Sequence, residues 1–481
     1  MSKITNYFAV DLGATSGRTI LSSFDGEKVE MREITRFKHP MVPVGGHLYW
    51  DLPYLYNEIL EGLKVLAAEK IKIESIGIDT WGVDFAIFGS DGQLLGLPHC
   101  YRDEYSEGAM ERFFATRMPS KEVYSRTGIQ FMAFNSLFQL DTQRMMGGSA
   151  LAAASKILFM PDALIYMLTG KAVCEYTIAS TSQILNPNTR ELDADLLEAL
   201  GLRREQFGTM VQPGEVVGPI SAQVQKATGL GPVKVVAVAG HDTASAVVSV
   251  PAKDSRFAYL SCGTWSLLGI ESATPIINER SFKENFTNEG GIDGTTRFLK
   301  NICGLWLFEK CREDFYKDPL RFPDAPQGIK ELSAKCMESD YEGIIFPDDE
   351  HFVHPDSMTE AISEYCRRTR QEVPETVADF VRCIYHSLAL RYKDVVKLLE
   401  EMCGFSIDSL NVIGGGSQNQ YLMQMTADSL GIPVICGPTE GTALGNALVQ
   451  IRAKGLVSNL WEMRRIVAAS VEVKTYLPAN K

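Results

Sequence analysis

An aspartate directly before a turn of small residues is the first arrangement in this sequence with chemical potential. Asp11 ends an alternating apolar segment, residues 8–12, and the small-residue turn 13–17 leads into β-favouring residues from Arg18. Small residues let backbone N–H groups approach an anion closely, and a carboxylate beside that anion can hold a cation. The spacing therefore indicates a magnesium–phosphate site, with an ordinary hairpin and polar turn as the alternative.

The same arrangement returns in the second half of the chain. Residues 258–269 again form the pattern strand, small polar turn and strand, with Thr264 in the turn, and three glycines at 414–416 follow another short apolar strand. Two such hairpins can hold a polyphosphate from both sides, and their relationship indicates a duplicated domain. The sequence has no Gly-x-x-x-x-Gly-Lys-Ser/Thr segment, so a nucleotide would not bind in a P-loop.

Two further predicted strands lead into acidic residues. Residues 75–79 form a short apolar strand ending at Asp79, with Trp81 and Asp84 close behind it, and the valine-rich strand 233–239 leads through Gly-His to Asp242. Ligands of open α/β sheets gather at the carboxyl ends of strands, so both segments are candidate site edges. For the first, the alternative is that Asp79 only caps a turn and Trp81 belongs to the core.

The rest of the pattern predicts alternating helices and strands. Apolar residues at helical spacing predict helices over 52–70, 376–402 and 419–430, and short apolar runs predict strands over 410–413 and 433–436. Residues 176–182 predict a strand and turn, and residues 329–374 predict a loop-rich surface segment. A polar break after residue 250 predicts two domains, residues 1–250 and 251–481.

Composition excludes several classes of function. The 481 residues are 45% apolar and 22% charged with a net charge of −13, which is typical of a globular protein and argues against a nucleic-acid partner. Without a signal segment or a run of about 18 apolar residues, we expect a cytoplasmic protein with no membrane partner. The ten cysteines include no Cys-x-x-Cys pair and are expected to be free thiols. His351 and His354 lack further ligands at metal-binding spacing, so no metal site is expected there.

Five segments make the chain similar to the FGGY carbohydrate kinases, in the sugar-kinase branch of the actin-like ATPase superfamily. They are residues 11–18, 78–84, 240–243, 262–266 and 414–417, in the order of that family and spread over nearly the whole chain. The resemblance implies an α/β fold of two actin-like (ribonuclease H-like) domains with a central cleft. It assigns the sugar and the first phosphate loop to the N-terminal domain and nucleotide binding to the C-terminal domain.

The resemblance also implies roles for residues at matching positions. Asp242 is expected to be the catalytic base, and Asp11 is expected to organise Mg²⁺. The residues expected to contact ATP are Ala14, Thr15, Ser16, Gly17, Arg18, Thr264, Glu309, Gly415 and Gly416. The residues expected to contact the sugar are Gly82, His241, Asp242, Thr243 and Asn301. Glu309 stands where these kinases carry Gln, and Tyr101-Arg102-Asp103 stands where they carry Trp-Arg-Asp.

Within that family, residues 79–85, 288–291 and 300–306 resemble the branch that phosphorylates L-rhamnulose. The implied reaction is ATP-dependent transfer of a phosphoryl group to O1 of L-rhamnulose, giving L-rhamnulose 1-phosphate in L-rhamnose catabolism. A kinase of L-fuculose or of another ketose is the alternative within the family. The alternative that is not a metabolic enzyme is an actin-like ATPase module. The sequence leaves the oligomeric state undefined.

Overall fold

The computed structural model describes residues 4–353 and 355–479, so His354 and the expectation attached to it lie outside the described residues. The chain divides into two compact units. Unit 1 comprises residues 1–251, 271–298 and 441–470, and unit 2 comprises residues 252–270, 299–440 and 471–481. Two segments from the C-terminal half thus belong to unit 1. The division into consecutive domains at residues 250 and 251 stays a prediction.

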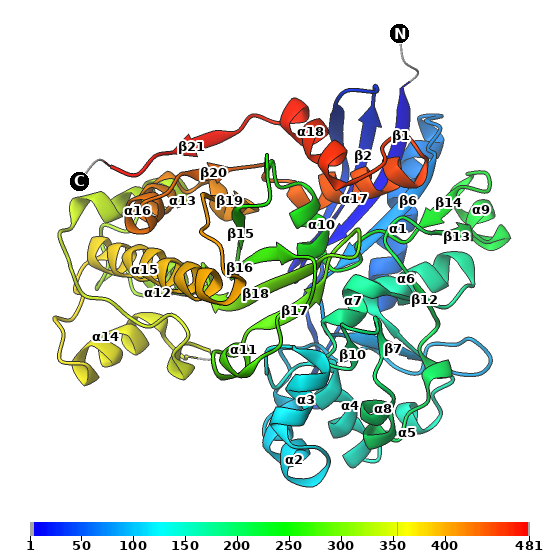
Figure 1. Ribbon diagram of the computed structural model, residues 1–481, viewed down its shortest axis with the longest axis horizontal. Coiled ribbons are helices and arrows are strands. Elements are labelled where there is room, and N and C mark those ends of the chain that lie inside the picture. Colours follow the sequence, from blue (N-terminus) through cyan, green and yellow to red (C-terminus); the bar gives the residue numbers. More distant parts are fainter. Residues whose placement is uncertain (1–3, 354, 480–481) are drawn as a thin grey trace. The chain divides into compact units, whose positions relative to one another are not determined.

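Unit 1 is built around a six-stranded sheet with the strand order β13-β14-β6-β1-β2-β3 (Figure 1). The strands are β1 (Thr5–Leu12), β2 (Ser16–Phe24), β3 (Val29–Lys38), β6 (Ser75–Thr80), β13 (Val216–Pro219) and β14 (Lys234–Val236). The predicted hairpin is the antiparallel pair β1 and β2, while β6 pairs in parallel with both β1 and β14. The carboxyl ends of three parallel strands therefore meet at one edge of this sheet.

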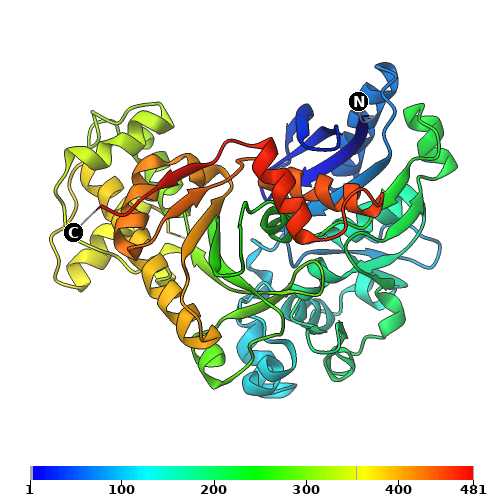
Figure 2. The ribbon, with the colours of Figure 1, turned by 45° about the horizontal axis from the view of Figure 1, so that its top comes forward.

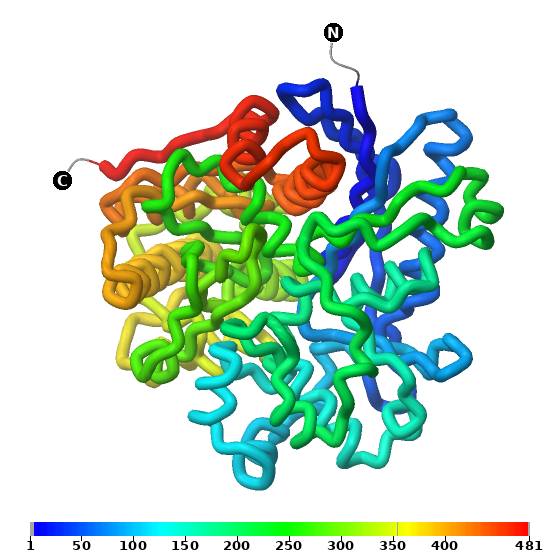
Figure 3. The backbone as a smooth tube through the Cα atoms, turned by 45° about the vertical axis from the view of Figure 1, so that its right-hand side comes forward, coloured from blue at the N-terminus to red at the C-terminus, as the bar shows by residue number. Residues whose placement is uncertain are grey.

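Helices from distant parts of the sequence cover the unit 1 sheet. α1 (Leu52–Ala68) begins where the Asp51 side chain accepts a hydrogen bond from the Tyr54 amide, and its buried residues include Leu55. α17 (Gly441–Ala453) packs on β1, β6 and α10 (Asp242–Val248), as the tube in Figure 3 shows for its orange segment beside the blue strands. A Cβ at Gly445 would lie 1.8 Å from the Ser245 carbonyl oxygen, so only glycine permits the close contact of α10 and α17.

The remaining elements of unit 1 are short, and part of them enclose a second apolar core that includes Phe113, Phe138 and Leu196. The strands are β4 (Val42–Val44), β5 (His47–Tyr49), β7 (Phe85–Phe88), β8 (Lys156–Phe159), β9 (Val173–Glu175), β10 (Leu185–Asn186), β11 (Glu191–Leu192) and β12 (Thr209–Val211). The helices are η1 (Glu104–Ser106), α2 (Ala109–Thr116), α3 (Ser120–Thr127), α4 (Ser136–Met145), α5 (Ser149–Ala152), α6 (Met160–Thr169), α7 (Tyr176–Ser180), α8 (Ala194–Leu200), η2 (Arg204–Gln206), α9 (Ala222–Thr228), α11 (Glu279–Lys283) and α18 (Leu460–Ser470).

The second sheet has seven strands in the order β17-β18-β16-β15-β19-β20-β21. They are β15 (Phe257–Cys262), β16 (Trp265–Ser272), β17 (Thr287–Gly290), β18 (Thr296–Cys303), β19 (Ser409–Ile413), β20 (Val434–Cys436) and β21 (Lys474–Tyr476). Within unit 2, β15 and β16 form the second predicted hairpin, and β15, β19 and β20 run parallel. This plan, a hairpin followed by parallel strands, repeats that of unit 1.

Helices of unit 2 flank the parallel strands. They are α12 (Trp306–Lys317), α13 (Ile329–Ala334), η3 (Lys335–Glu338), η4 (Glu350–Phe352), α14 (Met358–Arg368), α15 (Val377–Cys403), η5 (Gly415–Gln418) and α16 (Gln420–Leu430). The long helix α15 packs on α16 and appears in yellow to orange in Figure 2. A capping box of Thr376 and Asp379 starts α15, and Gly404 in the left-handed conformation ends it.

Most predicted elements are confirmed, and two predictions need correction. The strand predicted over 176–182 is wrong, because residues 176–180 form α7, whose first amides donate to the side chain of Glu175. The segment 329–374 is loop-rich only in part, because it includes α13 and α14. All ten cysteines are free thiols, as expected. Among the described residues, none of the helices is long and apolar enough to cross a membrane.

Candidate active site

Three acidic residues meet at the carboxyl edge of the unit 1 sheet. Parallel pairing of β1 with β6 places Asp11 opposite Asp79. The next residue of β6, Thr80, forms a bridge with His241, and its amide donates to the Gly240 carbonyl oxygen at 2.9 Å. Asp242 follows as the first residue of α10. The parallel register therefore brings Asp242, the predicted base, and Asp11, the predicted magnesium ligand, to one edge of the sheet. Asp79 is a third carboxylate at the same edge.

The charges at this edge act on one another. Burial raises the pKa of Asp79 well above its usual value, and the negative charges of Asp11 and Asp242 raise it further. Burial also raises the pKa of Asp242; His241 opposes this effect and Asp11 adds to it. Asp79 Oδ2 accepts a hydrogen bond from Asn446 at 2.6 Å, whereas its buried Oδ1 has no hydrogen-bond partner within the described part of the chain. A cation held here would lower the electrostatic cost of these carboxylates.

The predicted first phosphate loop is the β1–β2 turn together with the start of β2. Ala14 and Thr15 lie in the turn, and the Gly13 amide donates to the Ser16 carbonyl oxygen at 3.0 Å. Gly17 is packed so closely that an added Cβ would lie 2.5 Å from the Phe37 ring. Arg18 lies opposite Asp11 in the hairpin and donates through Nε and Nη2 to Asp11 Oδ2, at 2.9 and 2.7 Å.

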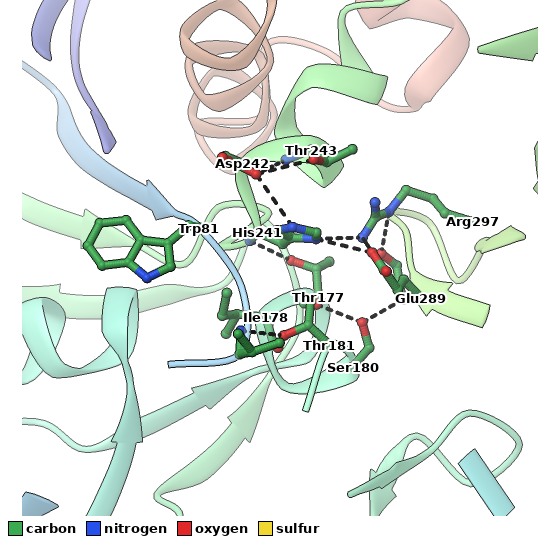
Figure 4. A network of polar contacts seen from close by, with 12 residues as sticks. Trp81, Thr177, Ile178, Ser180, Thr181, His241, Asp242, Thr243, Glu289 and Arg297 are labelled. Carbon is green, nitrogen blue, oxygen red and sulfur yellow. Dashed lines mark hydrogen bonds and ion pairs between the residues drawn. The ribbon is translucent and has the colours of Figure 1, made fainter. Parts of the chain in front are cut away.

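A buried charge network stands behind Asp242, as Figure 4 shows. His241 Nε2 lies 3.4 Å from Asp242 Oδ1, which also accepts a hydrogen bond from the Thr243 amide at 2.6 Å. On the other side of the imidazole, Nδ1 lies 3.1 Å from Arg297 Nη2 and 3.2 Å from Glu289 Oε2. Arg297 and Glu289 form an ion pair of 3.0 Å. His241 therefore connects the predicted base to a charge pair in the interior of unit 1.

Sequence reasoning assigned no role to Glu289 or Arg297. Glu289 lies in the Asn-Glu-Gly-Gly segment that carried part of the resemblance, whereas Arg297 gave no signal. The Arg297 side chain is completely buried and also donates from Nε to the Gly290 carbonyl oxygen at 2.9 Å. Burial tends to raise the pKa of Glu289, but Arg297 and His241 outweigh that effect and hold it below its usual value. Its two neighbours therefore favour the ionised form of this buried carboxyl group.

A second buried carboxylate fixes the backbone of His241. Glu175 Oε2 accepts hydrogen bonds from the Gly240 amide at 2.9 Å and from Thr177 Oγ1 at 2.7 Å. Thr177 Oγ1 in turn lies 3.3 Å from the His241 amide nitrogen. The α7 segment, which the sequence analysis interpreted as a strand, is thus part of the support of the site.

The segment after β6 forms the wall beside this edge. Trp81 is buried and stacks on His39 with ring centroids 5.3 Å apart, so Trp81 belongs to the core, whereas nothing tests the other half of that alternative, that Asp79 only caps a turn. Asp84 accepts hydrogen bonds from the Trp81 and Trp50 side chains at 2.9 and 2.6 Å. At Gly82 an added Cβ would lie 3.1 Å from Thr181 Oγ1, so this backbone approaches α7 closely.

In unit 2, the predicted nucleotide residues gather at the carboxyl end of its parallel strands. Thr264 forms the β15–β16 turn, and its carbonyl oxygen accepts hydrogen bonds from the Gly304 and Trp306 amides at 3.2 and 3.1 Å. Gly414 has a φ of +85° and starts η5, and a Cβ at Gly416 would lie 2.3 Å from Cys262 Sγ. The glycine turn therefore packs directly on the strand end that precedes Thr264. No atom lies within 4 Å of the position of a Cβ at Gly415, among the described residues.

Asn301 and Glu309 belong to β18 and to the helix that follows it, α12. No observation tests the ligand contacts predicted for them. Glu309 is in the first turn of α12 and forms an ion pair with Arg312 at 2.5 Å. Burial raises its pKa, and Arg312 opposes the increase. Asn301 lies in β18. The ligand contacts assigned to the site residues of both units therefore stay predictions.

Comparison with known proteins identifies the family. Residues 6–249 match the N-terminal domain, and residues 258–454 the C-terminal domain, of the FGGY family of carbohydrate kinases. The chain belongs to the FGGY family of carbohydrate kinases. Membership in this family implies the use of ATP, and the α/β fold with two sheet-containing units agrees with it.

Relatives with curated names cover nearly the whole chain. A rhamnulokinase of Bacteroides thetaiotaomicron is 53% identical over 477 residues, covering 99% of this chain and 96% of the relative. A rhamnulokinase of Mannheimia succiniciproducens is 42% identical over 476 residues, covering 98% of this chain and 95% of the relative. This FGGY kinase thus has close relatives that share one name.

Solved structures of sugar kinases share the fold. A gluconate kinase from Lactobacillus acidophilus matches with a TM-score of 0.82 at 18% identity, covering 99% of this chain and 94% of that one. A xylulose kinase from the same organism matches with a TM-score of 0.80 at 18% identity, covering 98% and 94% of the two chains. At this identity the likeness supports the FGGY kinase fold and not a particular sugar.

Proposed function

We propose that this protein is an ATP-dependent kinase that phosphorylates L-rhamnulose at O1, yielding L-rhamnulose 1-phosphate for L-rhamnose catabolism. The observation that carries the chemistry is the position of Asp242 beside Asp11 and Asp79 at one sheet edge, with His241 against its carboxylate. The choice of L-rhamnulose rests on the 53% and 42% identical relatives named rhamnulokinase. We also propose that the protein acts in the cytoplasm, on small molecules alone.

Asp242 acts as the general base in this proposal. The hydrogen bonds from the Thr243 amide and hydroxyl, at 2.6 and 3.2 Å, and the contact with His241 all involve Oδ1. We assign Oδ2 to the proton of the sugar hydroxyl, because Oδ1 is held in place by its neighbours. Phosphoryl transfer asks the protein mainly for positioning and charge neutralisation, and one carboxylate suffices to take the proton of the acceptor.

Mg²⁺ is assigned to the edge formed by Asp11 and Asp79. Carboxylate oxygens are the protein ligands that Mg²⁺ prefers, usually one or two of them together with water and phosphate oxygens. The Asp79 oxygen without a partner and the mutual effect of the carboxylates on their pKa values fit that ion. When bound, Mg²⁺ neutralises charge on the phosphates. Arg18, paired with Asp11 in the phosphate loop, supplies a second positive charge to the same region.

The other predicted contacts divide between the two units. In unit 1, the turn residues Ala14 and Thr15 offer backbone amides to a phosphate, and Gly82, His241 and Thr243 are assigned to the sugar. In unit 2, Thr264, Gly415, Gly416 and Glu309 are assigned to the nucleotide and Asn301 to the sugar. The open space at Gly415 suits a planar base or ribose that approaches the backbone.

Glu289 and Arg297 are positioning residues in this proposal. His241 Nδ1 faces two groups: Arg297 Nη2 at 3.1 Å, which only donates, and Glu289 Oε2 at 3.2 Å, which only accepts. We assign Nδ1 as the acceptor of an Arg297 N–H, because the ion pair of 3.0 Å with Arg297 already gives Glu289 Oε2 a donor. The imidazole proton then resides on Nε2 and faces Asp242 Oδ1 at 3.4 Å. Glu289 balances the charge of Arg297 and anchors it. The pair thereby selects the tautomer of His241 that supports the base.

A substrate panel tests the proposed function. Release of ADP by the purified protein is measured with L-rhamnulose, L-fuculose, D-xylulose and glycerol at one ATP concentration. We expect the highest kcat/KM for L-rhamnulose. A preference of about tenfold or more for another ketose, equal to about 1.4 kcal/mol in transition-state binding, would contradict the sugar but not the kinase. ATP hydrolysis that is independent of every sugar would favour an actin-like ATPase module instead.

A further inference from the structure

A group of metal-binding side chains lies in unit 1 outside the network of Asp242. It consists of His47 at the start of β5, His99 and Asp103, and one potential ligand atom from each lies within 4.8 Å of the other two. Backbone pairing brings these residues together, because Tyr49 forms a bridge with His99 and the Cys100 amide donates to the Leu48 carbonyl oxygen at 2.9 Å. Within residues 4–353 and 355–479 this is the one such group of His, Cys, Asp and Glu.

The carboxylate of the group is already held in place. Asp103 is buried; its Oδ1 accepts a hydrogen bond from the Tyr105 amide at 2.8 Å, and its Oδ2 accepts one from the Leu48 amide. Each carboxylate oxygen keeps a second lone pair for another partner. His47 Nδ1 lies 3.2 Å from Oδ1, and His99 Nδ1 lies 3.9 Å from Oδ2. The two imidazoles thus approach the same carboxylate.

Aromatic packing restricts the His99 ring. Its centroid lies 4.3 Å from that of Tyr105, in a stacked arrangement, and 4.5 Å from that of Tyr49. The Nδ1 atom of His99 is buried and has no hydrogen-bond partner among the described residues. Asp103 caps the Tyr105 amide and contacts His47, so the positions of the Asp103 and His47 side chains can be explained without a ligand. These contacts do not explain the buried Nδ1 of His99, and a buried polar atom without a partner is unfavourable.

We propose that His47, His99 and Asp103 form a binding site for Zn²⁺ or a similar divalent transition metal. Two imidazole nitrogens and one carboxylate oxygen are a ligand set that zinc accepts, with a water molecule in the fourth position. Ligand atoms at about 2.0–2.1 Å from a tetrahedral ion lie about 3.3 Å apart, which the His47–Asp103 distance of 3.2 Å already matches. Mg²⁺ prefers oxygen ligands alone, so this site is separate from the metal assigned to ATP.

The bound ion would join two segments of unit 1. His47 belongs to the β4–β5 hairpin, whereas His99 and Asp103 flank Tyr101, whose amide donates to Asp84 at 3.1 Å. The site thereby gives a function to the Tyr-Arg-Asp segment that replaces the Trp-Arg-Asp of other FGGY kinases. We expect zinc to raise the melting temperature of the protein, because a ligand of the native state stabilises it.

Metal binding by the full chain tests the proposal, independently of any kinase activity. The protein is stripped with a chelator and titrated with Zn²⁺ by calorimetry, and Co²⁺ is used as a coloured probe of the ligand set. We expect one ion per chain and Co²⁺ bands in the visible range that indicate four-coordinate nitrogen and oxygen ligands. Absence of stoichiometric binding, or a strong thiolate charge-transfer band, would overturn the proposal.

Three variants locate the ion. His99→Phe keeps an aromatic ring between the two tyrosines but removes its nitrogen, and His47→Ala removes a ligand that is 32% exposed. Each should weaken Zn²⁺ binding by at least about tenfold and abolish the thermal shift. His386→Ala is the matched control, because His386 is a half-buried histidine of α15 outside the group. Unchanged affinity in His99→Phe or His47→Ala would refute the site.

Discussion

Two aspartates of unit 1, Asp84 and Asp242, differ in how fully their carboxylates are enclosed, which separates a structural acceptor from the residue proposed as the base. Asp84 is completely buried and accepts hydrogen bonds from Trp50, Trp81, Gln139 and the Tyr101 amide. Asp242 has a side chain that is 27% exposed, and its named contacts all involve one oxygen. A carboxylate surrounded by four donors stabilises the fold, whereas one with an oxygen directed elsewhere can take a proton.

Replacement of Asp242 gives the largest expected effect and is the strongest test of this contrast. Asp242→Asn should lower kcat by about 10²–10⁴-fold, which is the usual contribution of a general base. Because the side chain keeps its size and the Thr243 amide keeps an acceptor, the free energy of unfolding should change little. ADP release and urea denaturation measure the two quantities. A variant with nearly normal turnover would show that the base lies elsewhere.

Replacement of Asp84 should have the opposite pattern. Asp84→Ala leaves four buried donors without an acceptor, and each such group costs about 1–3 kcal/mol. Since partial relaxation reduces the sum, we expect a loss of about 4 kcal/mol in the free energy of unfolding, measured in urea. If the variant remained as stable as the parent and lost only activity, Asp84 would be a functional residue and the contrast would fail.

The ionisation of Asp84 should appear in the pH dependence of stability. Burial, the largest cause, raises its pKa to about 6 against the opposing effect of its hydrogen bonds, from an ordinary value of 3.8. Between these values the folded state holds a proton that the unfolded state has released. The free energy of unfolding therefore decreases as the pH rises through this window, by about 3 kcal/mol for this group.

Asp84→Asn provides the comparison for that measurement, because an amide does not titrate. Denaturation curves of parent and variant from pH 4 to pH 7 should differ in slope, with the decrease smaller in the variant. If the free energies of unfolding of parent and variant changed in parallel with pH, the Asp84 carboxyl group would be ionised over the whole range. Its four hydrogen-bond donors would favour that ionised form.

Replacement of Arg297 tests the support behind Asp242. Arg297→Met removes the donor to His241 Nδ1, so the imidazole can turn its other tautomer towards Asp242. We expect kcat to fall by about 10–100-fold with little change in the KM for ATP, because misalignment of a catalytic group has effects of this size. Nitrogen chemical shifts of His241 report the tautomer directly.

The controls for Arg297 separate position from stability. Arg297→Lys keeps a donor and should restore part of the rate. The double variant Arg297→Met/Glu289→Gln removes both charges, so no buried charge is left unpaired. It should recover stability but not kcat. If the parent enzyme is active and the folded variants turn over at the normal rate, the positioning role is wrong while the kinase proposal stands.

Local patterns were sufficient to predict several elements and the edge of the site. The alternating residues before Asp11 predicted β1, and apolar residues at helical spacing predicted α15 to within one residue at each end. Acidic residues after apolar strands indicated where a ligand would bind, because strand ends meet at one edge of a parallel sheet. These signals are short in range, so a single sequence contains them.

Other features depend on partners that are far away in the chain. α7 is rich in residues that favour strands, yet the Glu175 carboxylate accepts hydrogen bonds from the first amides of a helix there and also from the distant Gly240 amide. Glu289 lies in a motif to which the sequence analysis gave no role, and no sequence pattern pointed to Arg297. Only folding brings both residues beside His241.

The amino-acid sequence by itself determined the family and the two hairpins, and it indicated the carboxylate that we propose as the base, because these lie in contiguous motifs. Only the tertiary structure decided that Asp11 faces Asp79, that Asp84 is a structural acceptor, and that a buried ion pair supports His241. It also decided that residues 441–470 complete unit 1. The physical reason is that burial and register are properties of packed elements, and no local pattern records which distant residue supplies the neighbouring charge.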